Sequence, residues 1–479
     1  MASDTSNPQS DSPSHVSRRG LLGGAAAGGL GIALSGNVEA VAGTRPSAGY
    51  GALVPDPQGL LALPPGFTYE IVSQAGVTQL ANGEGPTPTD QDANGVFGRP
   101  GGSAVVTNHE IGSSESPGVP PLPALTYDPG ARGGTTTVEV DARGRRQREY
   151  VSLAGTHNNC AGGETPWETW LTCEETEART GDRNGALTLD HGYVFEVDPS
   201  NQEANRNKAA VPLKFLGRYA HEAVAVDPST STIYETEDAG NPNGLYFRWT
   251  PPAGFRGGRG ALRKLAEGPG GDTAGRLDAM SCYKGDRHVP DLSLATTPGT
   301  RYKVRWVPVP DRDARTVSVR KQFADDQVTR SRKLEGAWWG DGGAYFVASF
   351  ARKSDGSANE HDGQVWFYHP RSETVTLTTI FGVNPDPDVD AENYDGPDNM
   401  TVSPYGGLIL AEDGNGVQHL VGVTDQGKTY PMARNDLNGS EFAGPAFSAD
   451  GKVLFANIQS PGYTLAITGP WGRPSNARS

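Results

Sequence analysis

A unit of two short strands joined by a tight turn recurs in the later part of the chain, and an acidic residue stands near the start of each copy. Apolar and β-branched runs separated by Gly, Pro and Asp are typical of β-hairpins. A hairpin repeated at irregular spacing is more typical of the blades of a β-propeller than of a solenoid. The copies occupy residues 221–238, 334–348, 397–413 and 441–457.

Composition supports the same fold class. The sequence contains 64 glycines and 37 prolines, which stand largely at turns between apolar runs. Such punctuation suits a propeller or barrel better than a helical fold. We therefore predict an all-β protein, a six-bladed β-propeller with inserted loops and short helices.

The first residues have the features of an export signal. Residues 1–16 are polar and rich in serine, which predicts disorder. Arg18 and Arg19 then precede a mildly apolar run to Leu34, as in a twin-arginine (Tat) signal, although a chance Arg-Arg pair is the alternative. The small residues at 40–42 provide a cleavage site. We predict a Tat signal peptide and disordered N-terminus over 1–42 and one domain over 43–479. The Tat export machinery would then deliver a secreted, periplasmic or cell-surface protein.

Charge and cysteine content exclude several classes of protein. The net charge of −15 argues against nucleic-acid binding, which needs a basic surface. Three cysteines are too few for a disulfide scaffold. No apolar stretch of membrane-spanning length follows the N-terminal region, which argues against a transmembrane anchor. We expect a monomer that acts on a small molecule.

The repeated hairpins predict a convergence of acids. In a hairpin, the residue that enters the first strand lies opposite the residue that leaves the second, and in a propeller the inner strands line a central channel. Converging carboxylates repel one another unless cations neutralise them, so a metal cluster is expected. The alternative is that each acid only forms a turn at a blade edge. The acids concerned are Glu222, Glu335, Asp398 and Glu441 on first strands, with Glu237 and Glu412 on returning strands.

The stretch from Asn158 to Glu175 adds a different ligand type. Glycines and a Thr-Pro turn separate Cys160 from Glu174 and Glu175, so these three residues can meet at one end of a sheet. A thiolate beside carboxylates is unfavourable without a metal between them. Carboxylates favour calcium, whereas a thiolate favours iron or zinc. A Cys160–Cys173 disulfide or inert buried thiols are the alternatives.

The same stretch resembles the signature of the PhoX family of alkaline phosphatases: an asparagine pair, a cysteine, two glycines, Thr-Pro-Trp and a Thr-Cys-Glu-Glu run, between Asn158 and Glu175. The resemblance implies a secreted enzyme that hydrolyses small-molecule phosphate monoesters and releases inorganic phosphate. It also implies a cofactor of Fe³⁺ and Ca²⁺ with a bridging oxo group, in which Cys160 is an iron ligand. Asn108, in an Asn-His-Glu run, would contact the substrate phosphate.

The predicted site combines both arguments. Its catalytic residues are Asn108 and Lys333, which would hold the phosphate. The Asp-rich segment 384–399 and Asp413 do not fit an EF-hand loop, so only Asp398 enters the site from these segments. The predicted metal ligands are Cys160, Glu174, Glu175, Glu222, Glu237, Glu335, Asp398, Glu412 and Glu441.

Two departures from the family pattern leave the substrate open. Lys333 stands where the family has an arginine, and lysine keeps the charge but loses the bidentate fork. A second lysine upstream of Cys160 has no counterpart in residues 152–155. A phosphodiesterase of the same family is therefore an alternative. A calcium-dependent propeller lactonase and a non-catalytic calcium-binding propeller are the others, and neither of these two needs Cys160.

Overall fold

Short antiparallel strands make up most of the structure, as the apolar runs between Gly and Pro predict. The computed structural model describes residues 48–112 and 114–475. The predicted signal peptide at 1–42 lies outside these residues. The described part of the chain contains no helix that is long and apolar enough to cross a membrane.

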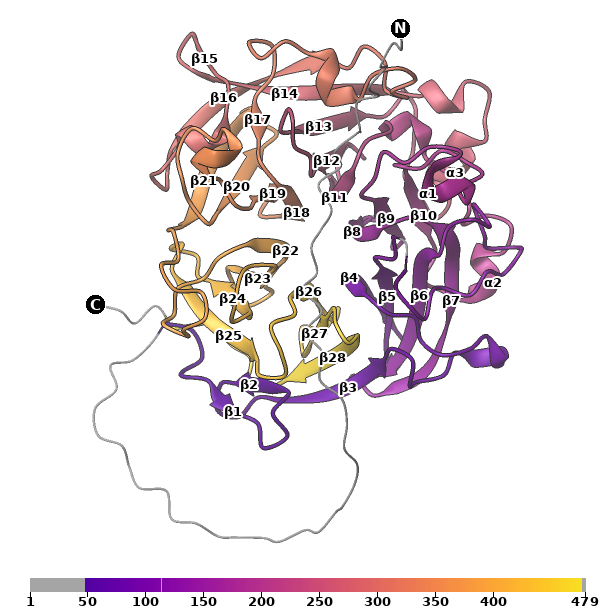
Figure 1. Ribbon diagram of the computed structural model, residues 1–479, viewed down its shortest axis with the longest axis vertical. Coiled ribbons are helices and arrows are strands. Elements are labelled where there is room, and N and C mark those ends of the chain that lie inside the picture. Colours follow the sequence, from indigo (N-terminus) through magenta and orange to yellow (C-terminus); the bar gives the residue numbers. More distant parts are fainter. Residues whose placement is uncertain (1–47, 113, 476–479) are drawn as a thin grey trace, which may run out of the picture. The chain divides into compact units, whose positions relative to one another are not determined.

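Six groups of strands follow one another along the chain, and the first strand of each lies near the centre (Figure 1). The first three groups are β4–β7 (Gln91–Arg99, Gly102–His109, Gly133–Asp141, Arg146–Thr156), β8–β10 (Asn159–Glu164, Trp170–Glu174, Val194–Val197) and β11–β14 (His221–Val226, Ile233–Glu237, Gly244–Thr250, Arg276–Lys284). The others are β18–β21 (Leu334–Gly340, Gly343–Ala348, Gly363–His369, Thr374–Phe381), β22–β25 (Pro397–Val402, Leu408–Glu412, His419–Val423, Thr429–Asn435) and β26–β28 (Phe442–Phe447, Val453–Ile458, Tyr463–Thr468).

The remaining elements extend or connect these groups. Strand β16 (Arg301–Pro308) pairs with both β14 and β21 and so joins the third and fourth groups, whereas β15 (Arg287–Val289) pairs with β14 and β17 (Arg330–Ser331) with β13. Strands β1 (Val54–Pro55) and β2 (Leu61–Leu63) extend the sheet of β25. The helices are short: α1 (Asp182–Gly185), α2 (Gln202–Asn205), α3 (Ala261–Ala266) and the 3₁₀ segments Ala81–Gly83, Lys214–Leu216, Gly271–Thr273, Leu292–Leu294, Val319–Gln322 and Lys353–Asp355.

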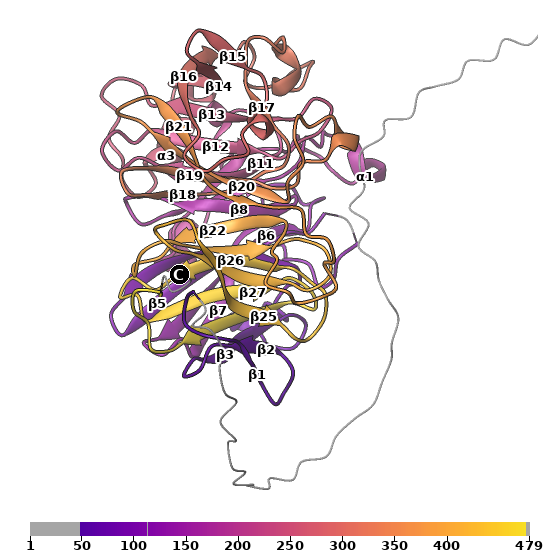
Figure 2. The ribbon, with the colours of Figure 1, turned by 90° about the vertical axis from the view of Figure 1, so that its left-hand side faces the viewer.

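The six innermost strands contact one another in a closed ring. Strand β4 contacts β8, and the contacts continue through β11, β18, β22 and β26 back to β4. Strand β3 (Thr68–Gln74), from the N-terminal side, pairs with β28 and completes the last sheet. Strands β1, β2 and β3 accordingly lie together at one edge in both Figure 1 and Figure 2. These contacts confirm the predicted all-β propeller.

The core lies between neighbouring sheets. Its largest fully buried side chains include Trp170, Trp249, Trp366 and Phe195. Aromatic side chains of this size contribute much of the apolar area that a sheet can bury. The inner strands are therefore held in place by the packing between neighbouring sheets.

Candidate metal centre

The register of each inner hairpin shifts within its first few residues. In five hairpins the first residue of the inner strand pairs with the second strand, and the next two residues have no ladder partner. A β-bulge of this kind re-aims a side chain. The second residues of these strands are Asp92, Cys160, Glu222, Glu335 and Asp398, and in the sixth hairpin Glu441 directly precedes β26.

All of these side chains except Asp92 join with Glu175 and Asp413 in a continuous set of metal-ligand atoms. Three trios each bring one ligand atom per residue within 4.8 Å of the others. Glu222 belongs to two of the trios, and so does Asp398, so the trios are connected. Glu222 and Glu335 are buried, whereas Asp398 and Glu441 are half-buried. The trios are Cys160–Glu175–Glu222, Glu222–Glu335–Asp398 and Asp398–Asp413–Glu441.

Further acids of the cluster come from the second strands of four hairpins, at the position directly after the last paired residue. Strands β5, β9, β12 and β23 end at His109, Glu174, Glu237 and Glu412, each of which pairs with the first residue of the inner strand. The residue that follows each of them is acidic. These four acids are Glu110, Glu175, Asp238 and Asp413.

The predicted ligands Glu174, Glu237 and Glu412 lie outside the trios. Successive side chains of a strand point to opposite faces, so each of these glutamates points away from the acid that follows it. Glu174 contacts His191 at 2.6 Å, Glu237 contacts Arg320 at 3.2 Å and Glu412 contacts His419 at 2.8 Å. Of the Glu174–Glu175 pair, the geometry thus brings Glu175 to Cys160.

Cys160 is a buried thiol in the first of the three trios. All three cysteines are free, so Cys160 and Cys173 form no disulfide. The Cys160 Sγ donates to the carbonyl oxygen of His221 at 3.4 Å. Burial, with Glu222 and Glu175 nearby, raises the pKa of Cys160 well above its usual value. The thiol therefore keeps its proton unless a cation lies beside it.

Asn108 contacts the cysteine segment, not the open centre. Its Nδ2 donates to the carbonyl oxygens of Cys160 and Ala161, both at 2.7 Å. Its Oδ1 accepts from Trp170 Nε1 at 2.9 Å. The side chain is completely buried. The Nδ2 group of Asn108 thus holds the backbone around Cys160 and its Oδ1 is engaged by Trp170, so the structure does not direct this amide toward a phosphate position.

Lys333 brings a positive charge into the cluster. Its Nζ lies 3.0 Å from Glu335, 3.8 Å from Asp238 and 4.0 Å from Asp413. Burial lowers the pKa of Lys333, but these acids outweigh burial and raise it well above its usual value. The Lys333 backbone has φ 45°, in the left-handed region that is strained for a side-chain-bearing residue. The backbone is thus strained at the residue that holds this ammonium among the acids.

The acids cannot all be ionised without compensation. Burial raises the pKa of Asp92 to about 7, with Asp413 adding to the effect. Burial also raises the pKa of Glu335 to about 8, although Lys333 opposes the shift. The pKa values of Glu222 and Asp398 are raised well above the usual range by burial and by neighbouring acids. Protons or bound cations must therefore neutralise the cluster.

Comparison with known families identifies the family of this chain. The family model described as "Alkaline phosphatase PhoX" matches residues 48–462, which is most of the chain. The chain belongs to the PhoX family of alkaline phosphatases. It is accordingly an enzyme of the phosphoric monoester hydrolase class. No curated protein matches the chain by sequence.

Solved structures support the fold. PhoX from Pseudomonas fluorescens, in complex with vanadate, a transition state analogue, is 16% identical, with a TM-score of 0.64 over 89% of this chain and 97% of that chain. A gluconolactonase from Xanthomonas campestris is 14% identical, with a TM-score of 0.27 over 80% of this chain and 97% of that chain. A mutant Trypanosoma rangeli sialidase is 8% identical, with a TM-score of 0.38 over 85% and 59%. The last two likenesses are too weak to support an argument.

Four acids of the cluster were not among the ligands predicted from the sequence. Asp92 and Glu110 belong to a hairpin whose two strands are separated by only a short turn, and its acid–strand–turn–strand–acid pattern matches the later copies. Asp238 and Asp413 stand one position beyond the acids that were predicted. The acid–strand–turn–strand–acid pattern therefore contained all four acids. The sequence does not show, however, where a bulge shifts the alternation of side chains between the two faces of a strand.

Proposed function

We propose that this chain is a secreted, metal-dependent alkaline phosphatase that hydrolyses phosphate monoesters and uses an iron–calcium cluster at the centre of its propeller. The observation that carries the proposal is the position of the buried Cys160 thiol within a chain of buried and half-buried carboxylates. Neighbouring carboxylates destabilise a thiolate unless a cation lies between them.

The donor set fits two kinds of cation. Cys160, Glu175 and Glu222 offer one sulfur and two carboxylates, which suits a transition metal such as Fe³⁺. The other two trios offer only carboxylates, which suits Ca²⁺. Bound in these positions, the cations would act as Lewis acids toward a phosphoryl group and supply an activated oxygen nucleophile. The proposal includes a bridging oxo group because the family resemblance implies one.

Three polar side chains would organise the substrate and the ligands. The Lys333 ammonium would bind a phosphoryl oxygen and offset the charge of the transition state. Asn158 Nδ2 donates to Glu110 Oε1 at 3.0 Å and to Glu175 Oε2 at 3.3 Å, so it orients two cluster acids. Asn108 would act through the backbone of Cys160, which it holds with two hydrogen bonds.

The first residues support the proposed location of the enzyme outside the cytoplasm. Arg18 and Arg19 before a weakly apolar segment favour export by the Tat machinery. Tat export of a folded protein would allow the cluster to assemble before export. The mature enzyme would then act on phosphate esters outside the cytoplasm as a monomer and release inorganic phosphate.

The test compares the exported wild type with Cys160→Ala. We expect iron and calcium in the wild type, hydrolysis of p-nitrophenyl phosphate, and loss of both iron and activity in the variant. Elemental analysis and initial rates provide the measurements. A wild type that contains calcium alone, with a variant of equal activity, would contradict the proposed iron–calcium cluster.

A further inference from the structure

Three second strands end in the same way. Strands β9, β12 and β23 each end on a buried glutamate, and the next residue is a cluster acid: Glu174–Glu175, Glu237–Asp238 and Glu412–Asp413. Each of the three glutamates is bound by a buried cation, and each cation is bound in turn by a second carboxylate. We call each such set of side chains an acid–cation–acid relay.

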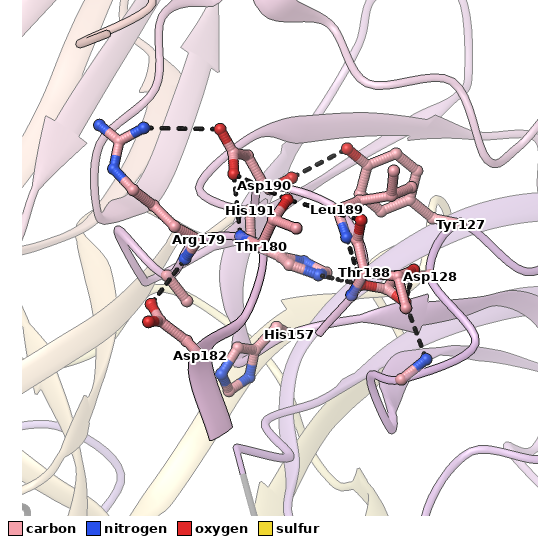
Figure 3. Close-up of polar contacts among 12 residues, drawn as sticks. Tyr127, Asp128, His157, Arg179, Thr180, Asp182, Thr188, Leu189, Asp190 and His191 are labelled. Carbon is pink, nitrogen blue, oxygen red and sulfur yellow. Dashed lines mark hydrogen bonds and ion pairs between the residues drawn. The ribbon is translucent and has the colours of Figure 1, made fainter. Parts of the chain in front are cut away.

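The first relay is Glu174–His191–Asp128. His191 Nδ1 lies 2.6 Å from Glu174 Oε1, and His191 Nε2 lies 3.2 Å from Asp128 Oδ2, with all three side chains completely buried. Figure 3 shows the His191 ring linked to Asp128, with His157 beside it. A neutral imidazole has one N–H, so it cannot donate to two carboxylates. Only an imidazolium can donate to both carboxylates, and although burial lowers the pKa of His191, Glu174 and Asp128 outweigh burial and raise it.

The carboxylate of Glu174 is fixed on every side. Besides His191, it accepts from the backbone N–H groups of His157 at 2.9 Å, Gly192 at 2.8 Å and Tyr193 at 3.1 Å. Four donors leave the side chain no alternative position. The backbone of the adjoining Glu175, which belongs to the trio of Cys160, is fixed with it.

The second relay, Glu412–His419–Asp390, repeats this geometry in another blade. His419 Nδ1 lies 2.8 Å from Glu412, and His419 Nε2 lies 3.4 Å from Asp390. Glu412 also accepts from the backbone N–H of Asp395 at 2.7 Å. The adjoining Asp413 belongs to the trio with Asp398 and Glu441.

The third relay uses arginine in place of histidine. Arg320 Nη1 lies 3.2 Å from Glu237 and 2.6 Å from Glu177. Glu237 also accepts from the backbone N–H of Leu245 at 3.1 Å. The adjoining Asp238 faces Lys333 at 3.8 Å. In three different sheets, the glutamate at the end of a second strand is thus paired with a buried cation, a histidine in two sheets and an arginine in one.

We propose that Glu174, Glu237 and Glu412 are positioning residues of the metal centre, each of which fixes the acid that follows it through an acid–cation–acid relay. This inference rests on the proposed metal-dependent function. Removal of such supporting partners reduces metal affinity or activity by about 10- to 100-fold in other metal sites. The relays also predict which metal depends on which glutamate, because each relay adjoins a different part of the cluster.

The test uses glutamine variants, which keep the side-chain shape and remove the charge. Glu174→Gln should lower iron per chain and kcat by about 10-fold or more, with most of the calcium retained. Glu412→Gln should lower calcium and retain iron. The matched control is Glu196→Gln, in the same sheet as Glu174: Glu196 is completely buried, lies 3.7 Å from Arg263 and accepts from Thr169 Oγ1 at 2.9 Å, but adjoins no cluster acid.

The measurements are the metal content of folded protein, the thermal midpoint Tm and the kinetic constants. We expect Glu196→Gln to lose thermal stability and to keep wild-type metal content and kcat. If Glu174→Gln and Glu412→Gln match this control in metal content, the relays are structural only and the inference is overturned. A wild type without metal would overturn the proposed function itself, and the inference with it.

Discussion

At the scale of single residues, the site depends on one ammonium among many carboxylates. Lys333 lies within 4.0 Å of three acids and has a strained backbone. Its neighbour Arg332 points elsewhere, because it pairs with Asp355 at 2.9 Å. The two adjacent cations therefore provide a matched comparison between a charge inside the cluster and a charge outside it.

Replacement of Lys333 should impair catalysis selectively. We expect Lys333→Met to lower kcat/KM for p-nitrophenyl phosphate by about 100-fold, since one preorganised group that stabilises the transition state is lost. Lys333→Arg keeps the charge and should stay within about 10-fold of the wild type. Arg332→Met is the control and should retain activity. Equal rates for Lys333→Met and the wild type would exclude Lys333 from phosphate binding.

At the scale of elements, close packing between inner strands determines where the ligands lie. A Cβ added at Gly336 on β18 would come within 2.7 Å of the Asp398 carbonyl oxygen and of the Asn399 Cα on β22. Gly444 on β26 has the same relation to Asp92 and Ala93 on β4, at 2.6 Å. These glycines let neighbouring strands approach at the positions that carry cluster acids.

Gly336→Ala should therefore disturb both stability and metal binding. Overpacking of this kind costs about 1–3 kcal/mol, because the backbone of β22 must move. We expect a lower Tm and a loss of calcium from the trios that contain Asp398. Gly258→Ala is the control, since a Cβ at Gly258 meets no atom within 4 Å. Wild-type calcium content in Gly336→Ala would show that β22 adapts without moving its ligand.

The same elements explain how far the sequence could be interpreted. Hairpin periodicity and turn residues predicted the propeller and the convergence of Glu222, Glu335, Asp398 and Glu441, since these depend on local pattern. The second-strand acids could not be placed, because a bulge shifts the alternation by one residue, and strand pairings such as that of His221 with Glu237 are not visible in the sequence. The relay partner His191 is likewise invisible in sequence, because its contacts are made by tertiary folding.

At the scale of the whole molecule, the acids at the centre of the propeller lower the free energy of unfolding when they are ionised. A buried acid whose pKa is raised in the folded state binds more protons there than in the unfolded chain. The free energy of unfolding then falls as pH rises from the unfolded pKa toward the folded pKa. For Glu335, which faces Lys333, Asp238 and Asp413, this range extends from about 4.5 to about 8. For Asp92 it extends from about 3.8 to about 7.

The pH dependence of thermal stability, with and without metal, tests most directly whether this cluster binds cations. We expect the Tm of chelator-treated protein to fall by several degrees between pH 5 and pH 8, over the range of the raised pKa values of Asp92 and Glu335. Addition of Fe³⁺ and Ca²⁺ should restore the Tm, with the largest gain at pH 8, where cations replace the missing protons. Superimposable Tm curves for the stripped and reloaded protein would contradict the account.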